Sequence, residues 1–233
     1  MYISNNKFRL GAVTRANVHE CAKLLAEQFV LSNDAWSTVN PPMEDAYKFM
    51  VNKTQEVLDW EDELKEEGMI PQDAFLSFTY LNEHGEIIGV TTNCELTQYL
   101  NKKSRVKLPQ FEVLEKYGHE LEKNIYAKDI VPGKNLYGIF TTMKKEYLGT
   151  GIVMLFWFDF SHYLHSLGFR FIYCRASSPK SYANLARYGA DDMAYIEGIE
   201  DGKKMRFWWM RWGLRPISVI GHLVDKFKIR AKM

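Results

Sequence analysis

The stretch that decides the fold covers residues 136–151 and reads LYGIFTTMKKEYLGTG. Its first eight residues, Leu136–Met143, predict a β-strand, and the apolar segment Ile152–Ser166 that follows the stretch predicts a helix ending at Gly168. Gly149 and Gly151 lie between the two. Glycines at such a junction let the backbone approach a ligand, and the first N–H groups of the helix are unpaired, so this end of a helix can bind phosphate.

The residues on either side predict further strands and helices. Downstream, Phe169–Ala176 predicts a strand, and Ser178 followed by Pro179 predicts the start of a helix that ends at Gly189. Residues 193–197 and 205–212 then predict a β-hairpin. Upstream we expect a strand over 8–12, a helix from 18 to about 30, a loop over 32–43, a helix over 44–67 and a hairpin over 74–92.

This order of elements predicts an α/β (mixed α+β) fold, built as one domain over residues 1–215 around a central mixed sheet of about seven strands flanked by helices. We expect the strands at 136–143 and 169–176 to be neighbours that splay apart at their C-terminal ends. Residues 95–134 are polar and lysine-rich, and we interpret them as a helical excursion. Residues 216–233 predict a C-terminal basic amphipathic helix with Ile217, Ile220, Leu223 and Phe227 on its apolar face.

The composition excludes several classes of protein. Of the 233 residues, 46% are hydrophobic and 25% are charged, which is ordinary for a globular chain and excludes a disordered or coiled-coil one. The longest apolar run, 152–158, is far shorter than a membrane span. A net charge of only +1 makes nucleic acid an unlikely partner.

Cysteine usage bears on the compartment. The chain has three scattered cysteines, Cys21, Cys94 and Cys174, which argues against a disulfide framework and for a reducing environment. We therefore expect a cytoplasmic protein. A mitochondrial location is the alternative, because three basic residues precede the first acidic one, Glu20.

The strand, the Gly-x-Gly and the following helix together resemble the GNAT N-acetyltransferase superfamily. In that family a Gln/Arg-x-x-Gly-x-Gly/Ala motif holds the pyrophosphate of acetyl-CoA, and the six residues here are Glu146-Tyr147-Leu148-Gly149-Thr150-Gly151. The segment Ser177-Ser178-Pro179-Lys180-Ser181 resembles more narrowly the Thr-Ser-x-x-Ser run of the arylalkylamine N-acetyltransferase branch. Phe29 and the run Asn33-Asp34-Ala35-Trp36 resemble that branch's Phe-x-x-x-Asp-Glu-Pro-Leu pattern.

The resemblance implies a set of site residues and acetyl-CoA as co-substrate. Direct transfer to a small amine needs a base, for which Asp34 is the candidate, and a hydroxyl that protonates the leaving thiolate. The candidate hydroxyls are those of Ser178, Ser181, Tyr182 and Tyr188, although Ser178 also fits a helix N-cap. No metal site is expected. The residues implied to bind acetyl-CoA are Thr141, Thr142, Met143, Leu148, Gly149, Thr150, Gly151, Ile152 and Val153.

Three departures from the family pattern leave two function classes open. Leu148 and Thr150 stand where relatives carry cations, and Leu185 replaces the tyrosine that many relatives use as general acid. The first class is an acetyl-CoA-dependent N-acyltransferase acting on a small amine. The alternative is a catalytically degenerate GNAT-fold protein that serves as a structural or accessory subunit of a larger assembly, a mitochondrial one included.

The basic, tryptophan-rich segment Trp208–Met233 bears on the same choice. It either folds back on its own domain or contacts a protein partner or a membrane surface, because a basic amphipathic helix suits both roles.

The glycine motif gives a direct test of acetyl-CoA binding. We expect Gly151→Asp to abolish CoA binding while the domain stays folded, because it places a side chain and a negative charge where phosphate would lie. Isothermal titration calorimetry with CoA measures the effect, and circular dichroism checks folding. CoA binding at the wild-type affinity would mean that the cofactor site lies elsewhere.

Overall fold

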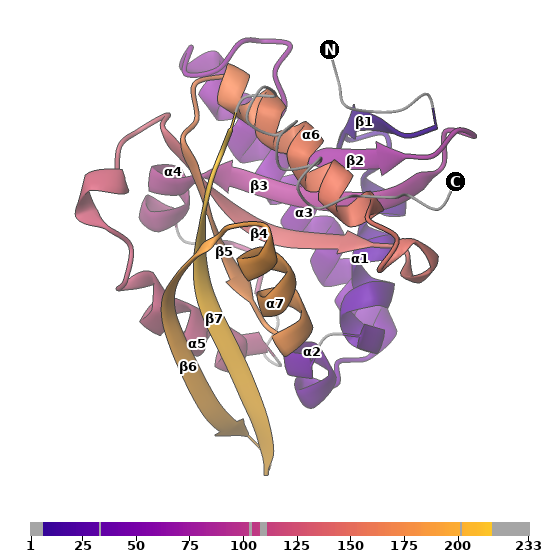
Figure 1. Cartoon of the computed structure of the whole chain (residues 1–233), viewed down its shortest axis with the longest axis vertical. Helices are drawn as coiled ribbons and strands as arrows, with labels where there is room; N and C mark the ends of the chain where they lie inside the picture. Colours follow the sequence, from indigo (N-terminus) through magenta and orange to yellow (C-terminus); the bar gives the residue numbers. More distant parts are fainter. Residues whose placement is uncertain (1–6, 33, 103, 108–110, 201, 216–233) are drawn as a thin grey trace.

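Seven strands pair into one sheet, in the order β1-β2-β3-β4-β5-β7-β6 (Figure 1). The computed structural model describes residues 7–215 except 33, 103, 108–110 and 201. All neighbouring strands are antiparallel apart from β4 and β5, which run parallel. The predicted mixed sheet of about seven strands is therefore confirmed. The strands are β1 (Arg9–Ala12), β2 (Phe78–Leu81), β3 (Ile87–Glu95), β4 (Asn135–Met143), β5 (Phe171–Ala176), β6 (Asp191–Glu200) and β7 (Lys203–Gly213).

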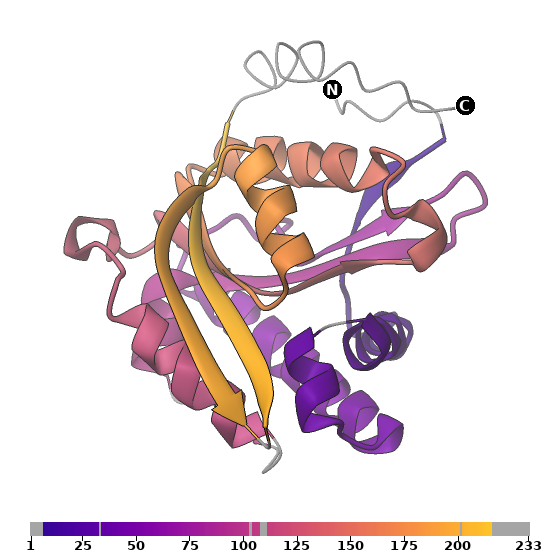
Figure 2. The same cartoon turned by 60° about the horizontal axis from the view of Figure 1, so that its bottom comes forward.

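Helices cover both faces of the sheet, with α6 and α7 on one face and α1, α2, α3 and α5 on the other (Figure 2). The α6 bounds are those predicted from the sequence. The helices are α1 (Val18–Ser32), α2 (Asp34–Val39), α3 (Met43–Glu66), α4 (Leu96–Asn101), α5 (Glu112–Glu122), α6 (Ile152–Ser166) and α7 (Pro179–Arg187), with short 3-10 turns η2 (Ala127–Asp129) and η3 (Lys145–Tyr147).

Two hydrophobic cores follow from this layering. One lies between the sheet and α1–α5, where Leu25, Met50 and Trp209 are fully buried. The other lies between the sheet and α6 and α7, where Phe160 and Trp212 are buried. Alternate residues of β7 thus enter opposite cores, as the pleat of a strand requires.

The structure corrects one expectation. The segment 32–43, expected as a loop because of Pro41-Pro42, contains helix α2, anchored by the buried Trp36. In the segment Trp208–Met233, Trp209 and Trp212 belong to the cores, whereas Trp208 is half-buried and stacks on Tyr182, so contact of this segment with a partner or a membrane surface stays a prediction. The predicted C-terminal helix at 216–233, with Ile217, Ile220, Leu223 and Phe227, lies outside the described residues.

The polar excursion at 95–134 contributes α4, α5 and η2. Its helix α5 packs against β6 and β7. Among the described residues, no helix combines the length and apolar character needed to cross a membrane.

Strands β4 and β5 form a fork. They pair only from Asn135–Phe171 to Gly138–Cys174, although β4 continues to Met143 and β5 to Ala176. The β3–β4 register shifts between the pairs Asn93–Gly138 and Thr92–Phe140, so Ile139 is an extra residue in β4. Such a bulge bends its strand, and the predicted splay between these neighbouring strands is confirmed.

The core beneath α6 gives a stability prediction. Phe160 is fully buried and stacks on Phe78, with the ring centroids 5.5 Å apart. Phe160→Ala should lower the free energy of unfolding by about 3–5 kcal/mol, because it removes that burial and leaves a cavity. Urea denaturation measures the change.

Leu31→Ala is the control, since that side chain is 74% exposed and its loss should cost less than about 0.5 kcal/mol. A similar cost for the two variants would contradict the assigned core.

Candidate active site

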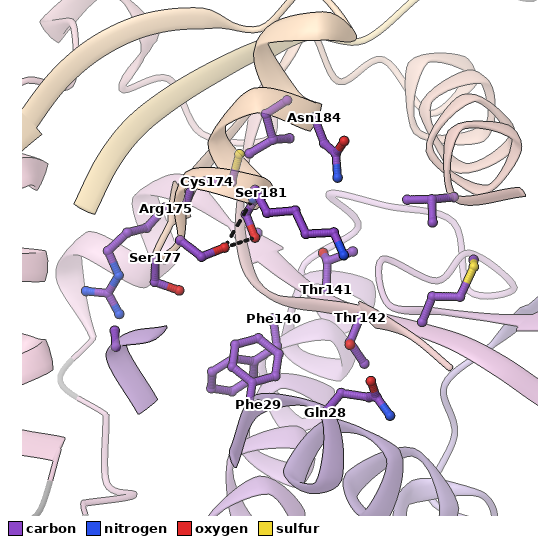
Figure 3. A pocket seen from close by; sticks show the side chains of 18 of the residues that line it. Gln28, Phe29, Phe140, Thr141, Thr142, Cys174, Arg175, Ser177, Ser181 and Asn184 are labelled. Carbon is purple, nitrogen blue, oxygen red and sulfur yellow. Dashed lines mark hydrogen bonds between the residues drawn. The ribbon is translucent and has the colours of Figure 1, made fainter. Parts of the chain in front are cut away.

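A cleft of about 220 Å³ lies at the fork between β4 and β5. Its lining includes members of both cores, such as Phe29 and Phe207 from one and Val153 and Leu185 from the other. The cleft therefore connects the two faces of the sheet where the strands part. Figure 3 shows Ser181 and Asn184 of α7 on one wall and Phe29 with Phe140 on the opposite wall.

The edge of β4 that faces β5 contributes unpaired backbone. Beyond Gly138 no residue of β5 pairs with it, and its residues 138–143 all line the cleft. The Thr141 hydroxyl is satisfied by Thr91 at 2.7 Å, and Met143 is buried. A strand edge without a partner leaves N–H and C=O groups that a ligand can bind.

The glycine loop lies at the N-terminus of α6. Gly149 and Gly151 have φ values of 79° and 87°, a left-handed conformation that disfavours any side chain. Thr150 caps the turn, because its hydroxyl donates to the Tyr147 carbonyl at 2.7 Å and accepts from the Ile152 N–H at 3.4 Å. Within the described part of the chain, the N–H groups of Gly149, Gly151 and Val153 have no hydrogen-bond partner.

Some residues of this loop line the cleft and others do not. Leu148 and Val153 line it, whereas Gly149, Thr150 and Gly151 lie next to them outside the lining. Ile152 is buried in the core and does not line the cleft. The unpaired N–H groups therefore lie at one end of the cleft, and the helix dipole adds partial positive charge there.

The start of α7 places two hydroxyls in the lining. Ser178 is the N-cap and Pro179 the first helical residue, as the sequence predicts. The Ser178 Oγ accepts from the Ser181 N–H at 3.1 Å and donates to the Ser181 Oγ at 2.9 Å. In this arrangement the hydroxyl proton of Ser181 has no acceptor among the described residues. The Ser181 hydroxyl can therefore donate to a ligand in the cleft.

Two of the predicted catalytic residues, Tyr182 and Asp34, are not among the described residues that line the cleft. Tyr182 does not line it: its ring stacks on Trp208, its hydroxyl donates to Asp192 at 3.0 Å, and that hydrogen bond raises the pKa of the tyrosine. Asp34 is the first residue of α2, and its side chain lies outside the described part of the structure. The next two residues, Ala35 and Trp36, line the cleft.

The lining contains one more candidate hydroxyl and several residues that the sequence did not assign to the site. Tyr188, one of the four candidate hydroxyls, lines the cleft, and burial raises the pKa of its hydroxyl. Cys174 also lines it, but burial raises the pKa of the thiol to about 12, so it stays protonated near neutral pH and is a poor nucleophile. Arg175 and Lys180 are the cations of the lining, and none of its described residues is Asp or Glu.

A metal centre finds no support in these residues. Among the described residues, no three His, Cys, Asp or Glu side chains gather in a way that could hold a metal ion.

Solved structures similar to this chain have the GNAT fold. The C-terminal condensation domain of Ebony, in complex with beta-alanyl-dopamine, has a TM-score of 0.65 at 14% identity, over 89% of this chain and 99% of that one. Arylalkylamine N-acetyltransferase 2 from Aedes aegypti has a TM-score of 0.64 at 12% identity, with the same two coverages. A putative arylalkylamine N-acetyltransferase 7 from that mosquito scores 0.65 at 14% identity, over 89% of this chain and 88% of that one.

No protein-family model and no curated protein sequence matches the chain. At such low identities the structural similarity establishes the fold, which is that of the GNAT acetyltransferases.

The serine pair predicts different costs for two substitutions. Ser178→Ala should lower the free energy of unfolding by about 1 kcal/mol, because it removes the N-cap of α7. Ser181→Ala should cost less, since the cap bond uses the backbone N–H of residue 181, which the variant keeps. Thermal or urea unfolding of both variants gives the comparison, and equal costs would contradict the capping role.

Proposed function

We propose that this protein transfers an acetyl group from acetyl-CoA to a small amine by direct attack. The observation that carries the proposal is the cleft at the fork, with unpaired N–H groups of the glycine loop at one end and the Ser178–Ser181 pair within its lining. The fold shared with arylalkylamine N-acetyltransferases supports the same reaction class.

The donor occupies the side of the cleft next to α6 and α7. Its pyrophosphate accepts hydrogen bonds from the N–H groups of Gly149, Gly151 and Val153, and its pantetheine arm pairs with the free edge of β4 at residues 141–143. Leu148 and Thr150 supply no charge, so Lys144, Lys145 and the cleft-lining Lys180 are the cations available for phosphate.

The acceptor enters from the side of α1, α2 and α5. Its neutral nitrogen forms a bond to the thioester carbon while backbone N–H groups on the free β4 edge stabilise the oxygen's developing charge. The C–S bond breaks, and the leaving thiolate takes the proton of the Ser181 hydroxyl, which the Ser178 hydroxyl replaces; solvent water then returns a proton to Ser178 and takes up the one that the base has removed from the amine. We assign the removal of the amine's proton to Asp34, which is next to two cleft-lining residues in the sequence.

A catalytic test follows from the direction of the serine hydrogen bond. Ser181→Ala should lower kcat by about 10²-fold while CoA affinity stays within about twofold, because the hydroxyl acts on the leaving group. The measurement is acetyl transfer from acetyl-CoA to a panel of arylalkylamines, followed by mass spectrometry. Asp34→Asn in the same assay tests the proposed base.

The matched control is Ser166→Ala, since that exposed serine lies at the far end of α6 and only bonds the Tyr163 carbonyl. A Ser181→Ala variant with wild-type kcat would remove this serine from the mechanism.

The accessory-subunit alternative rests on the replaced residues Leu148, Thr150 and Leu185. Leu148 and Leu185 both line the cleft, so the side chains that relatives use there are replaced by apolar ones. A purified chain that binds neither CoA nor acetyl-CoA in calorimetry would favour the subunit over the enzyme.

A further inference from the structure

The acceptor side of the cleft is aromatic. Phe29, Trp36 and Phe140 line it, with the Phe29 ring centroid 5.2 Å from that of Trp36 and 5.3 Å from that of Phe140. Phe29 and Phe140 are only partly buried, so their rings retain surface that a ligand can cover. Edge-to-face packing of this kind suits a planar aromatic ligand.

Arg175 adds a cation to this aromatic wall. It is the first residue of β5 after the last β4–β5 pair, so its backbone lies where the fork opens. In Figure 3 the Arg175 side chain lies near Ser177, to the left of the Phe29 and Phe140 rings. Its guanidinium packs over the Phe207 ring at 5.6 Å and donates from Nη1 to the Leu114 carbonyl at 2.9 Å.

The guanidinium of Arg175 has hydrogen-bonding capacity to spare. Of its five N–H groups, the Leu114 carbonyl accepts from only one nitrogen, and within the described residues no carboxylate lies within 4.0 Å. The nearby Glu122 carboxylate is engaged by the Tyr99 hydroxyl and His119. A half-buried guanidinium without an ion-pair partner is a suitable binding site for a planar anion.

Helix α5 carries a glycine where the Arg175 guanidinium packs against it. Gly118 lies inside the helix, where glycine is less favourable than alanine. A Cβ at that position would lie 2.2 Å from the Nη1 atom of Arg175, well inside van der Waals contact. The glycine therefore makes room for the guanidinium at the edge of the cleft.

We propose that the acceptor is an aromatic amino acid or a close analogue, whose carboxylate is bound by Arg175 and whose ring lies against Phe29, Trp36 and Phe140. Arg175 and Lys180 are cations of the described lining, and such charges suit an anionic ligand. This inference rests on the proposed function. The reaction forms the amide C–N bond, breaks the thioester C–S bond, and releases an N-acetyl amino acid and CoA with its thiol protonated.

The kinetic test compares two acceptors that differ only in the carboxylate. With acetyl-CoA, the wild-type kcat/KM for L-tyrosine should exceed that for tyramine by about tenfold or more, as a charge-assisted hydrogen bond allows. Arg175→Met should bring the ratio to about one, and Arg175→Lys should give an intermediate value. Arg187→Met is the control, since that exposed cation on α7 does not line the cleft and should leave the ratio unchanged.

A binding test separates this inference from the proposed function. Calorimetry without any acyl donor compares N-acetyl-L-tyrosine with N-acetyltyramine on the wild type and on Arg175→Met, with circular dichroism to check that the variant is folded. A preference for the carboxylate that needs Arg175 supports the anion site even where neither amine is acetylated, a result that would overturn only the acyltransferase. Turnover of tyramine with no carboxylate preference in either assay would overturn the inference alone.

Discussion

The parting of β4 from β5 is the constraint on which the rest of the site depends. β5 is held along its whole length by β7, from Phe171–Gly213 to Ala176–Trp208, whereas its pairing with β4 stops at Gly138–Cys174. The extra residue Ile139 bends β4 away. Backbone groups that a continuous sheet would satisfy are thereby left at the edge of a cleft, and the glycine loop and the start of α7 both adjoin that cleft.

Much of this architecture could be predicted from the sequence, because the signals are local. The bounds of α6 follow from Gly149-Thr150-Gly151 and Gly168, and the cap of α7 follows from Ser178-Pro179. Helix α2 could not be predicted in this way, because it has only six residues, precedes two prolines and owes its anchoring to the packing of Trp36 against Phe29 and Phe111. Tertiary packing of this kind has no periodic signature in the chain.

The site was harder to predict because its members come from distant segments. Arg175 resembles an ordinary polar residue in a strand, and the place of its guanidinium depends on Leu114 and Gly118 of α5. Tyr182 directly follows Ser181 in the sequence. The helix turns between the two residues, so the side chain of Tyr182 packs against Trp208 and Asp192. Which face of a short helix meets a cleft is decided by the elements around it.

The open edge of β4 couples occupancy to folding. A ligand that pairs with residues 139–143 supplies contacts that the native chain alone cannot make, and the unfolded chain has no such edge to offer. Mass action then adds to the stability of the native state, by about 2.7 kcal/mol at a free ligand concentration a hundred times Kd. A chain with such an edge therefore resists heat better when a ligand occupies the edge than when none does.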